Sequence, residues 1–282
     1  MTMQGKQIRI AAFGDNCVDY YDETEEVHFG GNPVNVAVYL SRMGRSVSYL
    51  GAVGTDSFGK AMIGALKKQQ IDVSHVQIRQ GSTACTHVSI QDGDRVLGEY
   101  EEGVMADYAP GPEDVSFMKN HDLAVTGLWG HGETLLKMLR SCGVTTVFDA
   151  ADRPDDPAAQ TALGSTDIFF FSEGDDSGVM TEKEGGSQDA DALILREKLY
   201  KLQQQGPRLV VATRGEKGSM AFDGQQYYAC GIVPCKVVDT MGAGDSYIAG
   251  FLHAWLDQKP IPACMEAGAA SSARTLSCAG AW

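Results

Sequence analysis

The stretch Asp239-Thr240-Met241-Gly242-Ala243-Gly244-Asp245-Ser246, which runs into Tyr247-Ile248-Ala249-Gly250-Phe251, decides the fold prediction. The first turn of a helix leaves backbone N–H groups without intrahelical partners and carries partial positive charge. Glycines there let a phosphate approach those N–H groups closely. A carboxylate in the same turn can accept the proton of a hydroxyl that attacks the phosphate. The segment therefore predicts an anion site beside a general base, as phosphoryl transfer to an alcohol requires. The simpler alternative is a helix start with an Asp cap, packed closely behind two glycines.

Composition limits the classes of protein that fit. The chain has 282 residues, of which 43% are hydrophobic and 21% are charged, as in globular proteins with a sizeable core. The formal net charge of −14 argues against a nucleic-acid partner, which would need a basic face. No segment approaches transmembrane length, so no membrane partner is expected. The seven cysteines are scattered without a CxxC pair, which predicts neither disulfides nor a zinc site and favours a cytoplasmic location.

Apolar runs alternate with helical patterns along most of the chain. The runs fall at residues 8–13, 47–53, 123–126, 144–148, 168–171 and 209–213. Their continuous hydrophobicity indicates strands covered on both faces, as in a parallel sheet. Helices are expected at residues 33–43 and 190–205, each closed by a glycine. The alternation predicts one α/β domain over residues 1–282, with a three-layer α/β/α core and a mostly parallel sheet.

Two regions depart from this alternation, at about residues 16–32 and 84–102. The first is acidic and irregular, and the second contains the turn Asp92-Gly93-Asp94 between two strand-like runs. In the second region Thr86, Val88 and Ile90 alternate with their neighbours, a pattern typical of a half-exposed hairpin. We expect both regions to form a small separate sheet. It would act as a lid over a substrate cleft, as a surface for a homodimer, or as both.

Three further motifs follow predicted strands or precede predicted helices. They are Gly14-Asp15-Asn16-Cys17-Val18-Asp19, Gly30-Gly31-Asn32-Pro33-Val34-Asn35 and Thr213-Arg214-Gly215-Glu216-Lys217-Gly218. In α/β sheets, ligands gather at the carboxyl ends of strands. The glycines permit tight turns, and the amides offer donors and acceptors to sugar hydroxyls. Taken singly, each motif is also compatible with an ordinary turn.

Taken together, the motifs resemble the two signatures of the PfkB carbohydrate kinase family, also called the ribokinase family. The resemblance implies a ribokinase-like fold and ATP-dependent phosphorylation of a sugar primary hydroxyl. It implies that Asp245 is the base and that the N–H groups of Gly242, Ala243 and Gly244 bind the transferred phosphoryl group. The sugar-binding residues would be Asp19, Asn16, Gly30, Gly31, Asn32 and Asn35, and the ATP-binding residues Thr213, Gly215 and Gly218.

The chain departs from that family at the expected magnesium motif, Asn-x-x-Glu. The strand at 168–171 is followed instead by Ser172-Glu173-Gly174-Asp175, so Glu173 and Asp175 are the candidate Mg²⁺ residues. Family members often bind a monovalent cation near the loop that holds Asp239. The sequence leaves open whether this chain does so. Other mechanisms lack their motifs, because there is neither a Gly-x-x-x-x-Gly-Lys-Ser/Thr loop nor a His-Glu-x-x-His pair.

Within the family, several segments resemble the kinases that act on fructoselysine. They include Gly31-Asn32-Pro33-Val34-Asn35-Val36, Glu102-Gly103-Val104-Met105, Leu128-Trp129-Gly130-His131 and Gly280-Ala281-Trp282. The resemblance implies phosphorylation of the 6-hydroxyl of an Amadori compound. Alternatives are a kinase for fructose, fructose-asparagine or another ketose conjugate, a nucleoside kinase, and a sugar-binding regulator without turnover. Glu99, Glu101 and Glu102 are candidates to hold the amino-acid part of the substrate, or form a solvated edge of the lid.

Overall fold

The computed structural model describes residues 7–91, 94–173 and 188–282. Its central sheet has eight strands in the order β14-β13-β12-β11-β10-β9-β1-β4. Their bounds are β1 (Arg9–Phe13), β4 (Ser46–Leu50), β9 (Leu123–Gly127), β10 (Thr145–Asp149), β11 (Ile168–Ser172), β12 (Leu209–Thr213), β13 (Ser219–Phe222) and β14 (Tyr227–Cys230). The six strands from β4 to β12 in this order are parallel, and β13 pairs antiparallel with both β12 and β14. The prediction of a mostly parallel sheet is confirmed.

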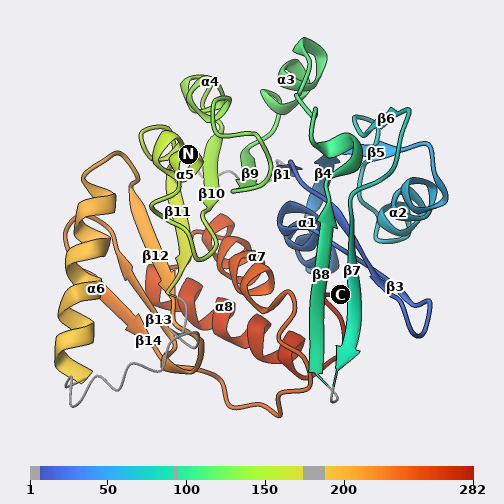
Figure 1. Ribbon diagram of the computed structural model, residues 1–282. Helices are drawn as coiled ribbons and strands as arrows, with labels where there is room; N and C mark the ends of the chain where they lie inside the picture. Colours follow the sequence, from blue (N-terminus) through green and yellow to red (C-terminus); the bar gives the residue numbers. More distant parts are fainter. Residues whose placement is uncertain (1–6, 92–93, 174–187) are drawn as a thin grey trace.

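Helices cover both faces of this sheet (Figure 1). One core cluster takes in α1 (Asn32–Arg42), α2 (Ser57–Lys68), α7 (Ala243–Leu256) and α8 (Ile261–Leu276). The other takes in α3 (Pro112–Met118), α4 (Leu136–Ser141), α5 (Pro157–Leu163) and α6 (Gln188–Gln203). Successive side chains of a strand point to opposite faces. Accordingly Ile10 and Ala12 of β1 join the first cluster, while Ala11 and Phe13 join the second.

A second sheet of four strands, in the order β3-β2-β7-β8, lies beside the central sheet. It consists of β2 (Cys17–Tyr21), β3 (Val27–Gly30), β7 (Cys85–Gln91) and β8 (Asp94–Glu101). In Figure 1, β7 and β8 stand side by side as two long antiparallel strands to the right of α7, with α2 and β3 farther out. These strands come from the two regions that depart from the α/β alternation. We call this element the second sheet.

The predicted strand at 47–53 is broken in the structure at Gly51, between β4 and β5 (Ala52–Gly54). A Cβ atom at Gly51 would lie 2.2 Å from the Tyr49 hydroxyl and 2.7 Å from the Gly14 carbonyl oxygen. The chain bends here because the loop after β1 packs directly against it, and β5 pairs with β6 (Gln77–Arg79) instead. In the described part of the chain, no helix has the length and apolarity needed to span a membrane.

Candidate active site

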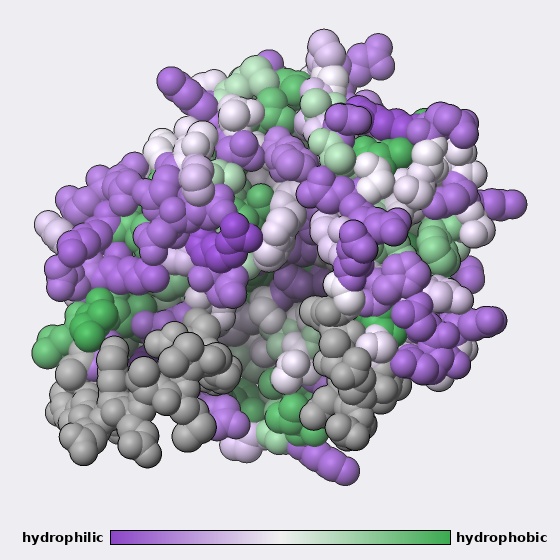
Figure 2. Space-filling view, in the orientation of Figure 1, coloured by the Kyte–Doolittle hydropathy of each residue, from purple (hydrophilic) through white to green (hydrophobic). Residues whose placement is uncertain are grey.

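A cavity of about 910 Å³ lies at the carboxyl ends of the parallel strands, and Figure 2 shows this face hollowed near its centre. Its walls come from the second sheet, from the loops after β1, β10 and β12, and from the start of α7. The lining includes Asp15, Asp19, Asn32, Thr86, Tyr100, Asp149, Thr213, Gly215, Gly218, Gly242, Ala243, Gly244 and Asp245. The topology thus brings together motifs that are far apart in the sequence.

The start of α7 is open to this cavity. Gly242 is the N-cap, with a left-handed φ of 71°, and α7 begins at Ala243. A Cβ atom at Gly242 would lie only 2.9 Å from the carbonyl oxygen of Ala281. At Gly244, by contrast, a Cβ atom would meet no atom of the described residues within 4 Å. The helix therefore begins at an open turn that an anion can approach, although Ala243 N donates to the Thr240 carbonyl oxygen at 3.3 Å. Asp245 stands in the same turn.

Two asparagines at the start of α1 hold the Asp245 carboxylate. Asn32 Nδ2 donates to Asp245 Oδ1 at 2.7 Å, and Asn35 Nδ2 donates to Asp245 Oδ2 at 2.6 Å. α1 begins after Gly31, whose φ of 104° suits glycine, and an added Cβ there would lie 2.6 Å from the Cα of Asn16. Both asparagines are one helical turn apart, which puts their amides on the same face toward α7.

Asn32 also joins Asp245 to a second carboxylate. Its Nδ2 donates to Asp149 Oδ2 at 2.6 Å, while its backbone N–H donates to Asp15 Oδ2 at 3.0 Å. Burial, followed by repulsion from Asp245, raises the pKa of Asp149 to about 7. Burial likewise raises the pKa of Asp15 to about 6 and that of Asp245 to about 6, against hydrogen bonds that lower them. Asp15, Asp149 and Asp245, three carboxylates with raised pKa values, therefore surround Asn32.

The electrostatic character of the cavity is acidic. Five aspartates line it: Asp15, Asp19, Asp149, Asp152 and Asp245. Among the described residues that line it, there is no lysine, arginine or histidine. In addition, the Oδ1 atoms of Asp15 and Asn32 are buried and have no hydrogen-bond partner within the described part of the chain. The acidic lining of the cavity suits a ligand that brings hydroxyl or ammonium donors.

The second sheet forms one end of the cavity. Asp19 of β2 pairs in register with Thr86 of β7, and Thr86 pairs with Tyr100 of β8, so the three lie side by side across the sheet. Gly30 leaves room beside Asp19, since a Cβ atom there would lie 3.7 Å from Asp19 Oδ2. Cys17 also lines this end, and burial raises the pKa of its thiol to about 12, so the thiol is neutral at pH 7. This end therefore presents a carboxylate and hydroxyl groups to a ligand.

Two predicted sugar-binding side chains have protein partners instead. Asn16 is fully buried beneath the cavity wall, and its Nδ2 donates to the Tyr49 hydroxyl at 3.1 Å and to the Ala52 carbonyl at 2.8 Å. The Asn35 amide is used by Asp245 on one side and by Trp282 Nε1 on the other, at 2.9 Å. The geometry favours supporting roles for both asparagines, because their Nδ2 groups already donate to protein acceptors.

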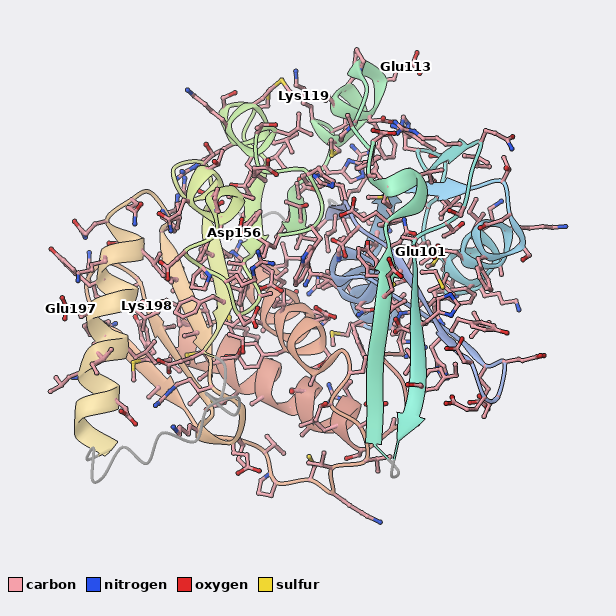
Figure 3. The ribbon with its side chains drawn as sticks, viewed as in Figure 1. Glu101, Glu113, Lys119, Asp156, Glu197 and Lys198 are labelled. Carbon is pink, nitrogen blue, oxygen red and sulfur yellow. The ribbon has the colours of Figure 1, made fainter. Side chains whose placement is uncertain are left out.

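The three glutamates considered for the amino-acid part of the substrate lie at the exposed edge of the second sheet. Tyr100 lines the cavity, and Glu101, which is labelled on β8 in Figure 3, is the next residue. Strand alternation therefore puts the Glu101 side chain on the other face. Glu101 pairs in register with Cys85, which belongs to the core cluster on that other face. Glu101 is nevertheless exposed, so the alternative of a solvated edge fits it better.

The opposite end of the cavity is formed by the loop after β12. Thr213 ends β12, and the turn that follows holds Gly215 at φ 52° and Gly218 at φ 79°. A Cβ atom at Gly218 would lie 2.2 Å from the Cys230 carbonyl oxygen, so a side chain would not fit. Beside this loop the cavity becomes apolar, with Ile232, Val233, Ala273 and Leu276 in its wall. Sequence reasoning missed these apolar residues, because they lie outside any motif.

The candidate magnesium residues are only partly described. Asp175 falls outside the described residues. Glu173 accepts from Arg214, with Nε and Oε2 3.2 Å apart, so the charge of Arg214 is also matched within the protein. Across the described residues, no group of three or more histidine, cysteine, aspartate or glutamate side chains is arranged to hold a metal ion. This does not exclude Mg²⁺ bound with ATP, because that ion takes one or two carboxylates plus substrate phosphates and water.

Comparisons with known proteins agree with this geometry. Residues 6–282 match the model of the pfkB family carbohydrate kinases. Fructoselysine 6-kinase of Shigella flexneri is 39% identical over 273 residues, which cover 97% of this chain and 99% of that protein. Fructosamine kinase FrlD of Bacillus subtilis (strain 168) is 31% identical over 98% of this chain and 93% of that protein.

Among solved structures, ribokinase of Arabidopsis thaliana complexed with ribose and ATP superposes with a TM-score of 0.78. It is 22% identical and covers 97% of this chain and 93% of its own, so this similarity establishes the fold. The family match extends over nearly the whole chain, including every motif that meets in the cavity. The chain therefore belongs to the pfkB family of carbohydrate kinases, which transfer a phosphoryl group from ATP to a sugar.

Proposed function

We propose that this kinase phosphorylates the primary 6-hydroxyl of an aminated ketose, with fructoselysine as its substrate. The observation that carries the proposal is the acidic cavity, which five aspartates line without a basic side chain among the described residues. An Amadori compound carries a positively charged nitrogen next to its sugar, whereas fructose and ribose are neutral. The names of the two relatives, a fructoselysine 6-kinase and a fructosamine kinase, support the same class of substrate.

The proposed reaction is direct in-line transfer. The sugar binds at the second-sheet end, with Asp19 accepting from its hydroxyls, and ATP lies along the loop from Thr213 to Gly218. Asp245 takes the proton of the primary hydroxyl as that oxygen attacks the γ-phosphorus, and the bond from the γ-phosphorus to the bridging oxygen breaks so that ADP leaves. The N–H groups of Gly242, Ala243 and Gly244 bind the charge on the transferred group. The second sheet acts as a lid that excludes water from this step.

The surroundings of Asp245 support its role as the base. Burial raises its pKa to about 6, against the hydrogen bonds from Asn35 and Asn32 that favour the ionised form. That value is close enough to neutral pH for efficient proton transfer. Asn32 donates to both Asp245 and Asp149 and so holds the two carboxylates in place.

Mg²⁺ fits the donor set of this region, since oxygen ligands and substrate phosphates are what it prefers. We assign Glu173, together with Asp175, to hold the ion beside the ATP phosphates, where it would neutralise their charge. A monovalent cation at the loop of Asp239 is a further proposal of this kind. Asp239 Oδ1 accepts from Met241 N at 3.1 Å and Oδ2 from Gly280 N at 2.6 Å, so this carboxylate orders the loop before α7.

We also propose a single cytoplasmic domain that forms a homodimer through the second sheet. The edge strands of this sheet are β3 and β8, and edge strands pair readily with another chain. Val27 of β3 is 37% exposed and Tyr100 of β8 is 41% exposed, so both edges carry apolar surface. Light scattering after size exclusion tests the assembly, and a mass of 30.2 kDa at micromolar concentration would contradict it.

A substrate screen tests the proposed function. ADP release is measured with fructoselysine, fructose-asparagine, fructose, ribose and adenosine at equal concentrations, and NMR of the product locates the phosphate. An ammonium near one carboxylate at an effective dielectric constant of about 20 gains up to ~4 kcal/mol, so kcat/KM for fructoselysine should exceed that for fructose at least ~100-fold. Equal kcat/KM for both sugars, or a preference for adenosine, would refute the assignment. Binding without turnover on any substrate would identify a regulator.

A further inference from the structure

Residues 280–282 pack against α1 and against the loop that begins α7, the two segments that carry Asn35 and the proposed base. Gly280 N donates to Asp239 Oδ2 at 2.6 Å. Ala281 lies against Gly242, where an added Cβ would come within 2.9 Å of its carbonyl oxygen. That carbonyl also accepts from the Tyr39 hydroxyl of α1. These contacts fix residues 280–282 between α1 and the loop that begins α7, and they place Trp282 beside Asn35.

The indole of Trp282 determines which way the Asn35 amide faces. An indole N–H can only donate, and an ionised carboxylate can only accept. Trp282 Nε1 lies 2.9 Å from Asn35 Oδ1, and Asn35 Nδ2 lies 2.6 Å from Asp245 Oδ2. Only one orientation of the amide satisfies both neighbours. Without the indole N–H, Asn35 Oδ1 loses its donor. The Asn35 amide is then no longer held in the orientation that turns Nδ2 toward Asp245.

We propose that Trp282 is a positioning residue for the catalytic carboxylate, because its N–H holds the Asn35 amide in the orientation that donates to Asp245. This inference rests on the proposed function, in which Asp245 is the base. The same ring stacks on Phe29 of β3, with centroids 6.2 Å apart and planes 27° apart. Trp282 thus links the second sheet, where the sugar binds, to the amide that orients the base.

The consequence appears in the titration of the base. Burial raises the pKa of Asp245, and the hydrogen bond from Asn35 lowers it. The other titratable groups around Asp245 are Asp149 at the end of β10, Asp15 after β1 and the Tyr39 hydroxyl on α1. A change confined to the indole N–H leaves these three groups in place. Any shift in the titration then reports the Asn35 hydrogen bond.

The experiment replaces Trp282 by phenylalanine, which keeps an aromatic ring against Phe29 and removes the N–H. With saturating Mg·ATP, we expect the acid limb of the kcat/KM profile for fructoselysine to move up by about one pH unit. The plateau kcat should fall about tenfold, since the base is less well oriented, while KM changes less than about twofold. Trp255→Phe on α7 is the matched control, because it makes the same chemical change far from the site and should leave the profile unchanged.

A second variant separates positioning from general stability. In an Asn35→Ala background, Trp282→Phe should have no further effect on the acid limb, because the amide through which it acts is gone. An unshifted acid limb in Trp282→Phe, or an equal shift in both backgrounds, would overturn the inference. A uniform loss of kcat that tracks a lower Tm would do the same. Asp245→Asn, assayed in parallel, tests the proposed function separately. Near-normal turnover in that variant would show that Asp245 is not the base, whatever the result for Trp282.

Discussion

Replacing Asp245 by asparagine should separate turnover from folding. The pKa of Asp245 is raised from 3.8 to about 6, so its ionised form destabilises the folded protein at pH 7 by at most about 3 kcal/mol. This cost declines as the pH falls through 6 and is gone below about 4, where the group is protonated in both states. The amide variant removes the cost.

The asparagine also introduces a mismatch. Two N–H donors, from Asn32 and Asn35, face the two carboxylate oxygens. An amide offers one oxygen to one of them and places its own NH₂ against the other, which costs about 1–3 kcal/mol. The two terms largely cancel. We therefore expect the Tm of Asp245→Asn to lie within about 4 °C of the wild-type value.

Turnover should respond very differently. Loss of general-base assistance lowers kcat by a factor on the order of 10²–10⁴, while sugar binding through Asp19 changes little. ADP release at saturating fructoselysine gives kcat, and calorimetric titration of the sugar gives Kd. Wild-type kcat in a folded variant would refute the role of Asp245. A loss of kcat matched by a collapse of Tm would refute the separation of the two effects.

Three further predictions follow from the same geometry. Asp149→Asn removes a negative neighbour of Asp245, so the pKa of Asp245 should fall. The acid limb of the kcat/KM profile should then move down by about one pH unit. An upward shift would contradict the repulsion between the two carboxylates. Gly244→Ala should lower kcat at least about tenfold with an unchanged Tm, because the methyl group enters the open space where we propose that the phosphate binds. Gly242→Ala should lower Tm as well, since its φ and its contact with Ala281 do not tolerate a side chain. Asp19→Asn should raise KM for the sugar about 10- to 100-fold without changing KM for ATP, and equal effects on both KM values would argue against its assigned place.

Much of the architecture follows from local patterns. Continuous apolar runs predict the parallel strands, and glycine-rich turns at their carboxyl ends predict where the ligand cavity lies. The strand expected at 47–53 was wrong at Gly51, because the break depends on the Gly14 loop packing against it. Such contacts between distant segments leave no periodic signal in the sequence.

The partners of the site residues were the least predictable part. Asn35 meets Trp282 across 247 positions, and Asn32 meets Asp149 across 117. A motif predicts that an amide is needed near the site, but it does not say whether that amide faces a sugar or a carboxylate. The tertiary fold decides this, and it assigns the Asn35 amide to the protein.

This assignment explains how an acidic cavity can keep a usable base. Three carboxylates around Asn32 would repel one another if all were ionised, and the repulsion would drive protons onto them near neutral pH. Asp245 accepts from the amides of Asn32 and Asn35, and Asp149 accepts from Asn32 and from the backbone N–H of Ala151, so each carboxylate has two donors. These donors favour the ionised forms against burial, and they hold Asp245, the proposed base, beside the open turn of α7. A cationic substrate would strengthen this arrangement further, because its charge offsets the repulsion that raises these pKa values.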